Sequence, residues 1–216
     1  MANLFRFILI AAISSLTLVA CNFLFSNNPS PPNQSLNDSK PLPVVQNVDP
    51  KTTEPERIPD APYLQTPNEA VVKMLEMAQV RSNDLVYDLG SGDGRIVIAA
   101  AQKFKAKAIG IEIDPELIRE SAREEESAIA QTPDIRDRIK FVKQDLFKTD
   151  LRDATVITLY LLPQANLRVR SEILPKLKSG TRVVSYEYDF GDLPPNRIEK
   201  IKIDGQEHMI YLWIIS

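Results

Sequence analysis

The sequence predicts an α/β fold with a mostly parallel sheet of seven strands, helices on both faces of that sheet and a C-terminal antiparallel hairpin. Short apolar runs alternate with segments of helical periodicity from about residue 63 onwards. This alternation is the pattern of a sheet whose parallel strands are joined by helices. Two β-rich runs then close the chain around Gly205-Gln206. Two such runs joined by a turn indicate a hairpin, which we expect to place an antiparallel strand at one edge of the sheet.

The elements follow in order along the chain. We expect strands over residues 84–90, 106–113, 138–145, 154–160, 181–188, 197–204 and 207–216, and helices over residues 66–80, 95–104, 114–131 and 163–180. Thr66 and Glu69 predict a capping box at the start of the first helix, with Pro67 at its first helical position. Asp114 is the expected cap of the third helix. The last helix should bend or break at Pro175 and end at Gly180.

The chain divides into three parts by composition. Residues 1–21 carry an apolar stretch and are interpreted as a signal peptide with a lipobox. Residues 22–61 are rich in Pro, Asn and Ser, so they cannot bury enough apolar surface to offset the entropy of ordering. They are predicted to form a disordered tether. Residues 62–216 carry the alternating pattern and form the predicted folded domain.

The leader bears on the location of the protein. Arg6 precedes an apolar run that ends in "LVAC", which resembles a bacterial lipobox, in which the peptide is cut before the cysteine and the thiol of Cys21 carries lipid. An uncleaved membrane anchor is the alternative, with the same topology, because no Lys or Arg follows the run until Lys40. We therefore expect a membrane-attached bacterial lipoprotein with its body on the exported side. A cytoplasmic protein with an incidental apolar leader is the remaining alternative; a leaderless product would need an alternative start codon, because the next methionine is Met74.

Composition excludes several classes of function. The net charge of −3 shows no basic excess, so we expect no nucleic-acid partner. Cys21 is the single cysteine and His208 the single histidine, so we expect no metal site built on these residue types. We interpret His208 as a strand residue beside Glu207 rather than as a catalytic base. The sequence does not indicate an oligomeric state.

The stretch "LVYDLGSGDGR" places Gly90, Gly92 and Gly94 directly after the first predicted strand. Glycines at this point let the backbone adopt positive φ and approach a ligand at the switch point of the sheet. A dinucleotide fingerprint would need its third glycine where Arg95 stands, so a nicotinamide-dependent oxidoreductase is disfavoured. No Gly-Lys-Ser/Thr follows, so the loop is not a P-loop.

The motif "YDLGSGDG" resembles the first motif of class I S-adenosylmethionine (SAM) dependent methyltransferases. The resemblance implies a Rossmann-like fold and SAM as methyl donor. It also implies that Glu112, which lies 22 residues after Gly90, holds the ribose hydroxyls, that Asp145 lies beside the adenine amino group and that Asp88 lies near the methionine part. The implied cofactor-binding residues are Asp88, Gly90, Ser91, Gly92, Gly94, Glu112, Asp145 and Leu146.

Other interpretations stay open for several of these side chains. Glu112 could be a solvated strand end, and Asp145 could cap a turn. Asp93 could belong to the cofactor loop or cap the next helix. Arg95 is interpreted as a packed or salt-bridged helix residue rather than a ligand.

A narrower resemblance covers about residues 62–216. The stretches "YLQTPNEAVVKMLEMA", "VYDLGSGDGRIVIAAA" and "TVITLYLLPQANLRVR" resemble small bacterial relatives of the protein-lysine methyltransferases that modify the mitochondrial ATP synthase c-subunit and the ADP/ATP carrier. This resemblance implies a protein substrate, methylated on a lysine amine by in-line transfer. A catalytically silent SAM-binding or structural lipoprotein with the same fold is the alternative.

The acceptor is expected over the end of the fourth strand. Tyr160 and Asn166 are the candidates for positioning it. Tyr63, Thr66 and Pro67 could close the site from the N-terminal side, and Glu187 and Asp189 are weaker candidates after the fifth strand.

Overall fold

The computed structural model describes residues 63–216. The predicted signal peptide and tether, residues 1–21 and 22–61, lie outside the described residues. In the part of the chain that is described, no helix combines the length and the apolar character needed to cross a membrane.

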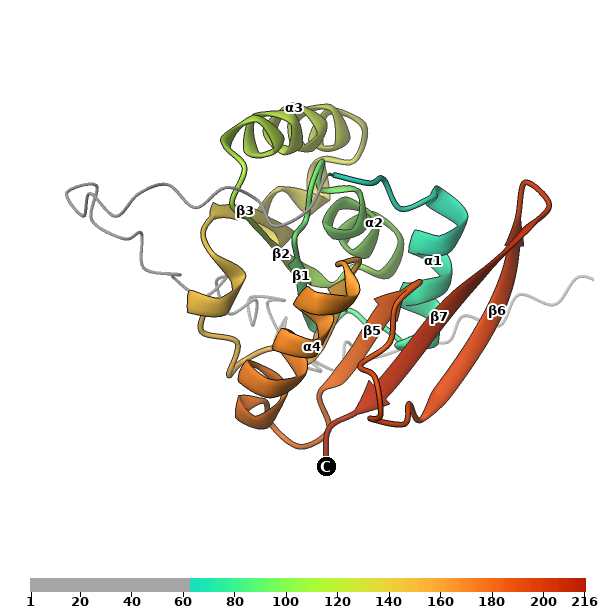
Figure 1. The fold of residues 1–216 in the computed structure, drawn as a ribbon. Helices are drawn as coiled ribbons and strands as arrows, with labels where there is room; N and C mark the ends of the chain where they lie inside the picture. Colours follow the sequence, from blue (N-terminus) through green and yellow to red (C-terminus); the bar gives the residue numbers. More distant parts are fainter. Residues whose placement is uncertain (1–62) are drawn as a thin grey trace, which may run out of the picture. The chain divides into compact units, whose positions relative to one another are not determined.

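A seven-stranded sheet forms the centre of the domain (Figure 1). Its strands are β1 (Leu85–Leu89), β2 (Lys107–Glu112), β3 (Ile139–Lys143), β4 (Val156–Leu159), β5 (Arg182–Tyr186), β6 (Arg197–Ile203) and β7 (Gln206–Ile214). Their order across the sheet is β3-β2-β1-β4-β5-β7-β6. The first five strands are parallel to one another, and β7 is antiparallel to both β5 and β6. The predicted seven-stranded, mostly parallel sheet with a closing hairpin is therefore confirmed.

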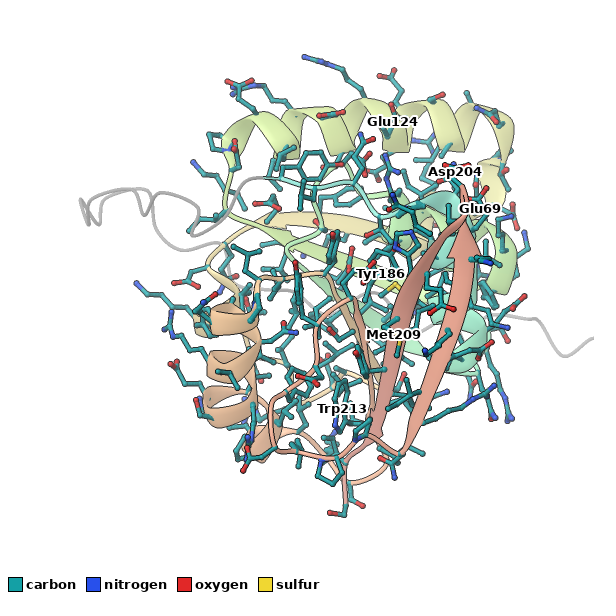
Figure 2. All side chains as sticks on the ribbon, turned by 45° about the vertical axis from the view of Figure 1, so that its right-hand side comes forward. Glu69, Glu124, Tyr186, Asp204, Met209 and Trp213 are labelled. Atoms are coloured by element: carbon teal, nitrogen blue, oxygen red, sulfur yellow. The ribbon has the colours of Figure 1, made fainter. Side chains whose placement is uncertain are left out.

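The hairpin differs from the prediction in one respect, because its antiparallel strand β7 lies inside the sheet and β6 forms the edge. Apolar composition explains this order. Ile210, Leu212 and Trp213 of β7 are buried, whereas β6 alternates charged and apolar residues and stays largely accessible. A charged outer strand protects a sheet edge from pairing with other chains. Asp204 and Gly205, both with positive φ, form the two-residue turn at the tip of the hairpin, where Figure 2 labels Asp204.

Helices cover both faces of the sheet, as predicted (Figure 1). On one face lie α1 (Asn68–Met77), α2 (Arg95–Phe104) and α3 (Pro115–Gln131), and on the other lies α4 (Pro163–Glu172). Three short 3₁₀ turns complete the domain: η1 (Pro133–Arg138), η2 (Leu146–Lys148) and η3 (Leu174–Lys176). The buried apolar side chains form two clusters, one under each layer of helices.

Two predicted helix ends were wrong. α1 begins at Asn68, one residue after Pro67, and no side chain caps it, so the capping box of Thr66 and Glu69 does not form. The carbonyl of Thr66 instead accepts a hydrogen bond from Arg95. The predicted break of the last helix near Pro175 is confirmed, because Pro175 lacks the N–H that a continuing helix needs and lies in η3. The predicted end at Gly180 is wrong, since α4 already ends at Glu172. By contrast, Asp114 caps α3 as expected, accepting a hydrogen bond from the nitrogen of Glu116 at 2.7 Å.

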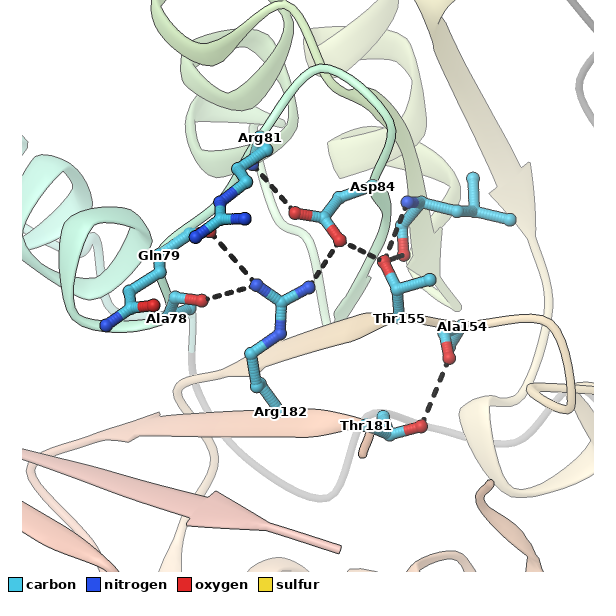
Figure 3. Close-up of polar contacts among 9 residues, drawn as sticks. Ala78, Gln79, Arg81, Asp84, Ala154, Thr155, Thr181 and Arg182 are labelled. Atoms are coloured by element: carbon cyan, nitrogen blue, oxygen red, sulfur yellow. Dashed lines mark hydrogen bonds and ion pairs between the residues drawn. The ribbon is translucent and has the colours of Figure 1, made fainter. Parts of the chain in front are cut away.

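A polar clamp closes the base of the sheet, at the amino ends of the parallel strands (Figure 3). Arg182, at the start of β5, donates to the carbonyl oxygens of Ala78 and Gln79 at 2.7 and 3.0 Å. It also forms an ion pair with the buried Asp84, which accepts a hydrogen bond from the Thr155 hydroxyl at 2.8 Å. The clamp joins the end of α1 to β1 and β5, at the end of the sheet opposite to the carboxyl ends of its strands.

Candidate active site

A cavity of about 300 Å³ lies at the carboxyl ends of β1, β2 and β4. The strand order reverses at β1 and β4, which is where open α/β sheets bind ligands. The volume of the cavity falls at the lower end of the range for small-molecule sites. The cavity brings together most of the predicted cofactor residues: Asp88, Gly90, Ser91, Glu112, Asp145 and Leu146 line it.

The glycine loop between β1 and α2 has the conformation that the sequence predicted. Gly90, Gly92 and Gly94 have φ angles of 76°, 54° and 84°. The nitrogen atoms of Gly90 and Ser91 both donate to the carbonyl of Ile111, at 2.9 and 3.0 Å, so the loop is anchored to β2. A Cβ atom on Gly90 would lie 2.9 Å from the Leu161 side chain. Position 90 therefore requires glycine for two reasons: its φ angle is positive, and there is no room for a side chain.

The other two glycines shape the loop without lining the cavity. A Cβ atom on Gly92 would overlap the ring of Tyr63, and one on Gly94 would overlap the ring of Phe141. Gly94 precedes the first residue of α2 and opens that helix. The two residues therefore allow Tyr63 and Phe141 to pack closely on the loop.

Glu112 ends β2, and its carboxylate is buried and bound to three backbone nitrogen atoms. One oxygen accepts from Ile113 at 2.7 Å and Asp114 at 2.9 Å, and the other accepts from Gly92 at 3.0 Å. With 8% of its surface exposed, Glu112 is not a solvated strand end. It fixes the loop after β2 and the glycine loop together at the cavity wall.

Asp88 lines the cavity and is 2% exposed. Its carboxylate accepts a hydrogen bond from the Thr158 hydroxyl of β4 at 2.7 Å. Burial raises its pKa to about 7, against the opposing effect of the Thr158 hydrogen bond and with a contribution from the nearby carboxylates of Glu112 and Asp93. The ionisation of Asp88 therefore takes place near neutral pH, where a cationic ligand would favour the charged form.

Asp145 and Leu146 follow β3 and line the cavity. The Asp145 carboxylate accepts a hydrogen bond from the Phe147 nitrogen at 2.9 Å and so caps η2. It lines the cavity as well. The two interpretations that the sequence left open for Asp145 are thus compatible, because a cap at this position faces the cavity.

Asp93 and Arg95 form an ion pair beside the glycine loop. The Arg95 Nε atom lies 3.0 Å from each oxygen of Asp93, and the backbone nitrogen of Arg95 donates to the same carboxylate at 3.2 Å. Arg95 is therefore salt-bridged, as interpreted from the sequence, and Asp93 caps the first residue of α2. Both residues line the cavity.

Two tyrosines that follow β4 and β5 line another part of the cavity. Tyr160 follows β4 and lines the cavity together with Tyr188, which follows β5. Their rings are stacked, with centroids 6.3 Å apart, and the buried Tyr186 meets Tyr160 edge to face at 4.9 Å. Burial raises the pKa of Tyr160. Tyr188 was missed from the sequence; the available signal was its place beyond a strand that ends next to β4.

Asn166 does not line the cavity. It is fully buried at the start of α4 and donates to the Ser185 hydroxyl at 3.1 Å and to the Tyr188 carbonyl at 2.9 Å. Asn166 therefore supports the backbone that carries Tyr188. Glu187 and Asp189 also lie outside the cavity lining.

The N-terminal side of the cavity is formed by Tyr63, Leu64 and Thr66, whereas Pro67 does not line it. The Tyr63 hydroxyl accepts a hydrogen bond from the Asp93 nitrogen at 3.4 Å. Burial and the nearby Asp93 carboxylate raise the pKa of Tyr63 to about 12, so this phenol stays protonated at neutral pH. Tyr63 and Leu64 are 39% and 52% exposed, which places them at the mouth of the cavity.

The residues present fit a ligand with hydroxyl and cationic groups. The Ser91 hydroxyl oxygen is buried at the cavity wall and has no hydrogen-bond partner. A buried polar atom without a partner is costly, and a ligand that bonds to it removes that cost. The carboxylates of Asp88, Glu112 and Asp145 face the same cavity. Across residues 63–216, no group of three or more His, Cys, Asp or Glu side chains is arranged to hold a metal ion.

Known proteins are similar to this chain in sequence or in fold. A protein-lysine N-methyltransferase of Saccharolobus islandicus is 40% identical over 160 residues, which are 74% of this chain and 96% of that protein. The human lysine N-methyltransferase named for the ATP synthase c-subunit is 29% identical over 143 residues, which are 66% of this chain and 58% of that protein. The crystal structure of an RNA methyltransferase from Salinibacter ruber in complex with S-adenosyl-L-homocysteine is 41% identical, with a TM-score of 0.64, and the match covers 71% of this chain and 94% of that one.

The sheet order, the glycine loop and the acid-lined cavity define a class I methyltransferase that uses SAM as methyl donor. The sequence also identifies a particular family within this class. Residues 88–197 match the sequence model of the ANTKMT methyltransferase domain, and the chain belongs to that family.

Proposed function

We propose that this methyltransferase modifies lysine amines of a protein. The observation that carries the proposal is the charge of the cavity. Among the described residues that line it, five carry carboxylates and one, Arg95, carries a cationic group, which is paired with Asp93. The carboxylates belong to Asp88, Asp93, Glu112, Asp114 and Asp145. The anionic field of these carboxylates favours the approach of a cationic peptide over that of a phosphate backbone.

The relatives differ in the substrate that their names state. The Saccharolobus islandicus protein is named a protein-lysine N-methyltransferase, and the Salinibacter ruber protein is named an RNA methyltransferase, at nearly the same identity to this chain. The names alone therefore do not decide between a protein and an RNA. The acidic cavity and the net charge of −3 favour the protein.

We assign the cofactor contacts to the residues that the cavity brings together. Asp88 would accept from the ammonium of SAM, Glu112 from the ribose hydroxyls and Asp145 from the adenine amino group. Leu146 would pack against the adenine ring. The start of the glycine loop, at Gly90 and Ser91, would lie against the rest of the cofactor, with the Ser91 hydroxyl as a further polar contact.

The chain's own residues then have to bind, orient and dehydrate the acceptor. When bound, SAM supplies an activated methyl group on a sulfonium, so no strong acid or base is required. Tyr160 and Tyr188 offer an aromatic surface to the lysine side chain. An amine has a free lone pair only in its neutral form, so the lysine would first release its proton to solvent. An apolar surrounding, such as the faces of the two tyrosine rings, would lower the pKa of the amine and favour that form. Alignment and exclusion of water supply the remaining acceleration.

Transfer of radiolabel from SAM tests the proposal. The full chain is incubated with methyl-labelled SAM and with one of two fractions from the source cells. One fraction is total protein treated beforehand with ribonuclease, and the other is total RNA treated beforehand with protease. We expect label in protein, recovered as methyllysine after hydrolysis. Label in the RNA fraction alone would show that the acceptor is a nucleotide rather than a lysine. Binding of SAM without transfer to either fraction would favour the catalytically silent alternative.

We further propose that Cys21 carries a lipid that attaches the protein to a membrane. The sequence "LVAC" after an apolar run supports this proposal. A Cys21→Ser variant should lose incorporation of labelled palmitate and leave the detergent phase on phase separation. Equal partition of the variant and the original chain into detergent would contradict lipid attachment and favour the uncleaved anchor, whereas absence of both from the detergent phase would favour the cytoplasmic alternative.

A further inference from the structure

His208, the single histidine of the sequence, lies directly behind the aromatic side of the cavity. It belongs to β7 and has Glu207 as its chain neighbour, yet its Nδ1 atom lies 2.8 Å from the hydroxyl of Tyr186 and is hydrogen-bonded to the Glu187 carboxylate. Figure 2 shows Tyr186 inside the molecule alongside β7. None of His208, Glu187 and Tyr186 lines the cavity. A role for this cluster must therefore act through neighbouring residues.

Glu187 is the centre of an unusual turn. The Tyr188 nitrogen donates to the Tyr186 carbonyl at 2.8 Å, and the intervening Glu187 has a φ angle of 64°. A hydrogen bond across one residue with positive φ defines the rare, strained form of the γ-turn. Such a conformation persists at a residue other than glycine only where its surroundings hold it in place.

Contacts from three elements hold this turn. The Glu187 nitrogen donates to the Met209 carbonyl of β7 at 2.8 Å, and its side chain is paired with His208. On the other side of the turn, the Tyr188 carbonyl accepts from the Ser185 hydroxyl and from the Asn166 amide. The direction in which the Tyr188 ring enters the cavity is thus fixed by these partners.

His208 reaches the second tyrosine of the cavity as well. Its contact with the Tyr186 hydroxyl holds the ring that packs edge to face on Tyr160, with centroids 4.9 Å apart. One imidazole therefore contacts the supports of both Tyr160 and Tyr188, whose stacked rings we call the aromatic wall.

We propose that His208 is a positioning residue for methyl transfer, which holds the aromatic wall in place through Glu187 and Tyr186. The proposal rests on the proposed function, because the wall is the surface that would orient the lysine side chain. His208 does not line the cavity that the cofactor carboxylates face, so its loss should affect the acceptor and spare SAM.

Variants of the full chain at position 208 test this role. His208→Ala removes the contact, whereas His208→Asn keeps a donor nitrogen bonded to Cγ, as Nδ1 is in histidine. With hexalysine as the acceptor probe, we expect His208→Ala to raise KM about tenfold, the equivalent of one lost hydrogen bond, with a smaller change in kcat. His208→Asn should recover much of that loss. Asp134→Ala, which removes an exposed ion pair with Lys105, is the matched surface control and should change neither constant.

Hydrogen exchange and calorimetry provide readouts that do not depend on the acceptor. In His208→Ala, the Tyr188 amide should exchange faster, while the amides of α2 and the affinity for S-adenosylhomocysteine stay unchanged. Unchanged exchange at Tyr188, or a loss of S-adenosylhomocysteine affinity in parallel with KM, would overturn the positioning role. If the original chain labels neither hexalysine nor total protein, the proposed function fails, and the exchange of the Tyr188 amide alone decides whether His208 holds the turn.

Discussion

The carboxylate of Glu112 accepts a hydrogen bond from the backbone nitrogen of Gly92 at 3.0 Å. This contact joins the end of β2 to the glycine loop that follows β1. The other oxygen of the same carboxylate accepts from Ile113 and Asp114. One side chain thus organises two loops of the cavity, and the first prediction follows from its removal.

Glu112→Ala should destabilise the fold and abolish SAM binding. The substitution leaves three backbone N–H groups without their acceptor, at about 1–3 kcal/mol for each group that stays buried. Glu112→Gln keeps one acceptor oxygen, so it should fold better and still bind SAM weakly. Urea unfolding and calorimetric titration measure the two effects. Glu116→Gln, on the exposed side of α3, is the control, and an equal loss of affinity in that variant would contradict the assignment.

Gly92→Ala should weaken SAM binding by displacing Tyr63. The new Cβ atom would overlap the Tyr63 ring and would occupy a residue with a φ angle of 54°. We expect a loss of affinity of about tenfold or more, from strain of roughly 1–3 kcal/mol. Adding Tyr63→Ala removes the overlap but leaves the backbone strain, so it should restore affinity only in part. Full retention of affinity in Gly92→Ala would show that the loop does not need this glycine.

The affinity for SAM should rise with pH through the ionisation of Asp88. In the free protein the pKa of Asp88 is raised to about 7 by burial, so at pH 6 most molecules carry a protonated Asp88. A cationic ligand binds the ionised form, so Kd should fall about eightfold between pH 6 and pH 7.5. Calorimetry in buffers of different ionisation enthalpy would also detect proton release on binding. Asp88→Asn should bind more weakly and show no such dependence on pH; the same slope in the variant would assign the effect to another group.

The same raised pKa makes a prediction about stability. Between the unfolded pKa of 3.8 and the folded pKa of about 7, the folded protein holds a proton that the unfolded chain has released. The contribution of Asp88 to the free energy of unfolding is therefore greatest below pH 4. It decreases as the pH rises to about 7, by about 1.4 kcal/mol per pH unit at most. Urea unfolding of the original chain and of Asp88→Asn, compared at pH 5 and pH 8, should show a smaller loss in the variant.

Arg182→Ala should lower stability without affecting the cavity. The substitution leaves the buried Asp84 without its cation, a change that costs about 3–5 kcal/mol for buried pairs. The carbonyl groups of Ala78 and Gln79 also lose their donor. Combining Arg182→Ala with Asp84→Asn should recover part of the loss, because no unpaired charge remains. SAM affinity at a temperature where both variants are folded should stay unchanged, and a large drop would show that the base of the sheet is coupled to the site.

The part of the site that could be predicted from the sequence is the local part. The loop from Asp88 to Arg95 is contiguous in the sequence. Three glycines directly after a predicted strand indicate a loop with positive φ angles, as the structure shows. Glu112 and Asp145 were singled out through the resemblance to class I methyltransferases. The structure brings both to the cavity because each ends or follows a strand on the same side of β1, and parallel strands bring their carboxyl ends to one edge.

The remaining features depend on contacts between distant residues. Asn166 was expected at the acceptor, but the structure buries it next to the backbone that carries Tyr188 of the aromatic wall. Its partners Ser185 and Tyr188 lie about twenty positions further along the chain, so the sequence around Asn166 does not reveal them. Hydrophobic periodicity indicates that β7 is a strand but not that it pairs between β5 and β6. The γ-turn at Glu187 has no local signature, since nothing in "SYEYD" requires a positive φ.

Calorimetric titration of the full chain with S-adenosylhomocysteine and SAM tests the central claim most directly, because that claim is that the glycine loop and the three carboxylates of Asp88, Glu112 and Asp145 form a SAM site. We predict saturable binding of both compounds at one site per chain, lost in Glu112→Ala and retained in Glu116→Gln. Absence of binding by a folded chain, or binding that Glu112→Ala leaves intact, would contradict the account.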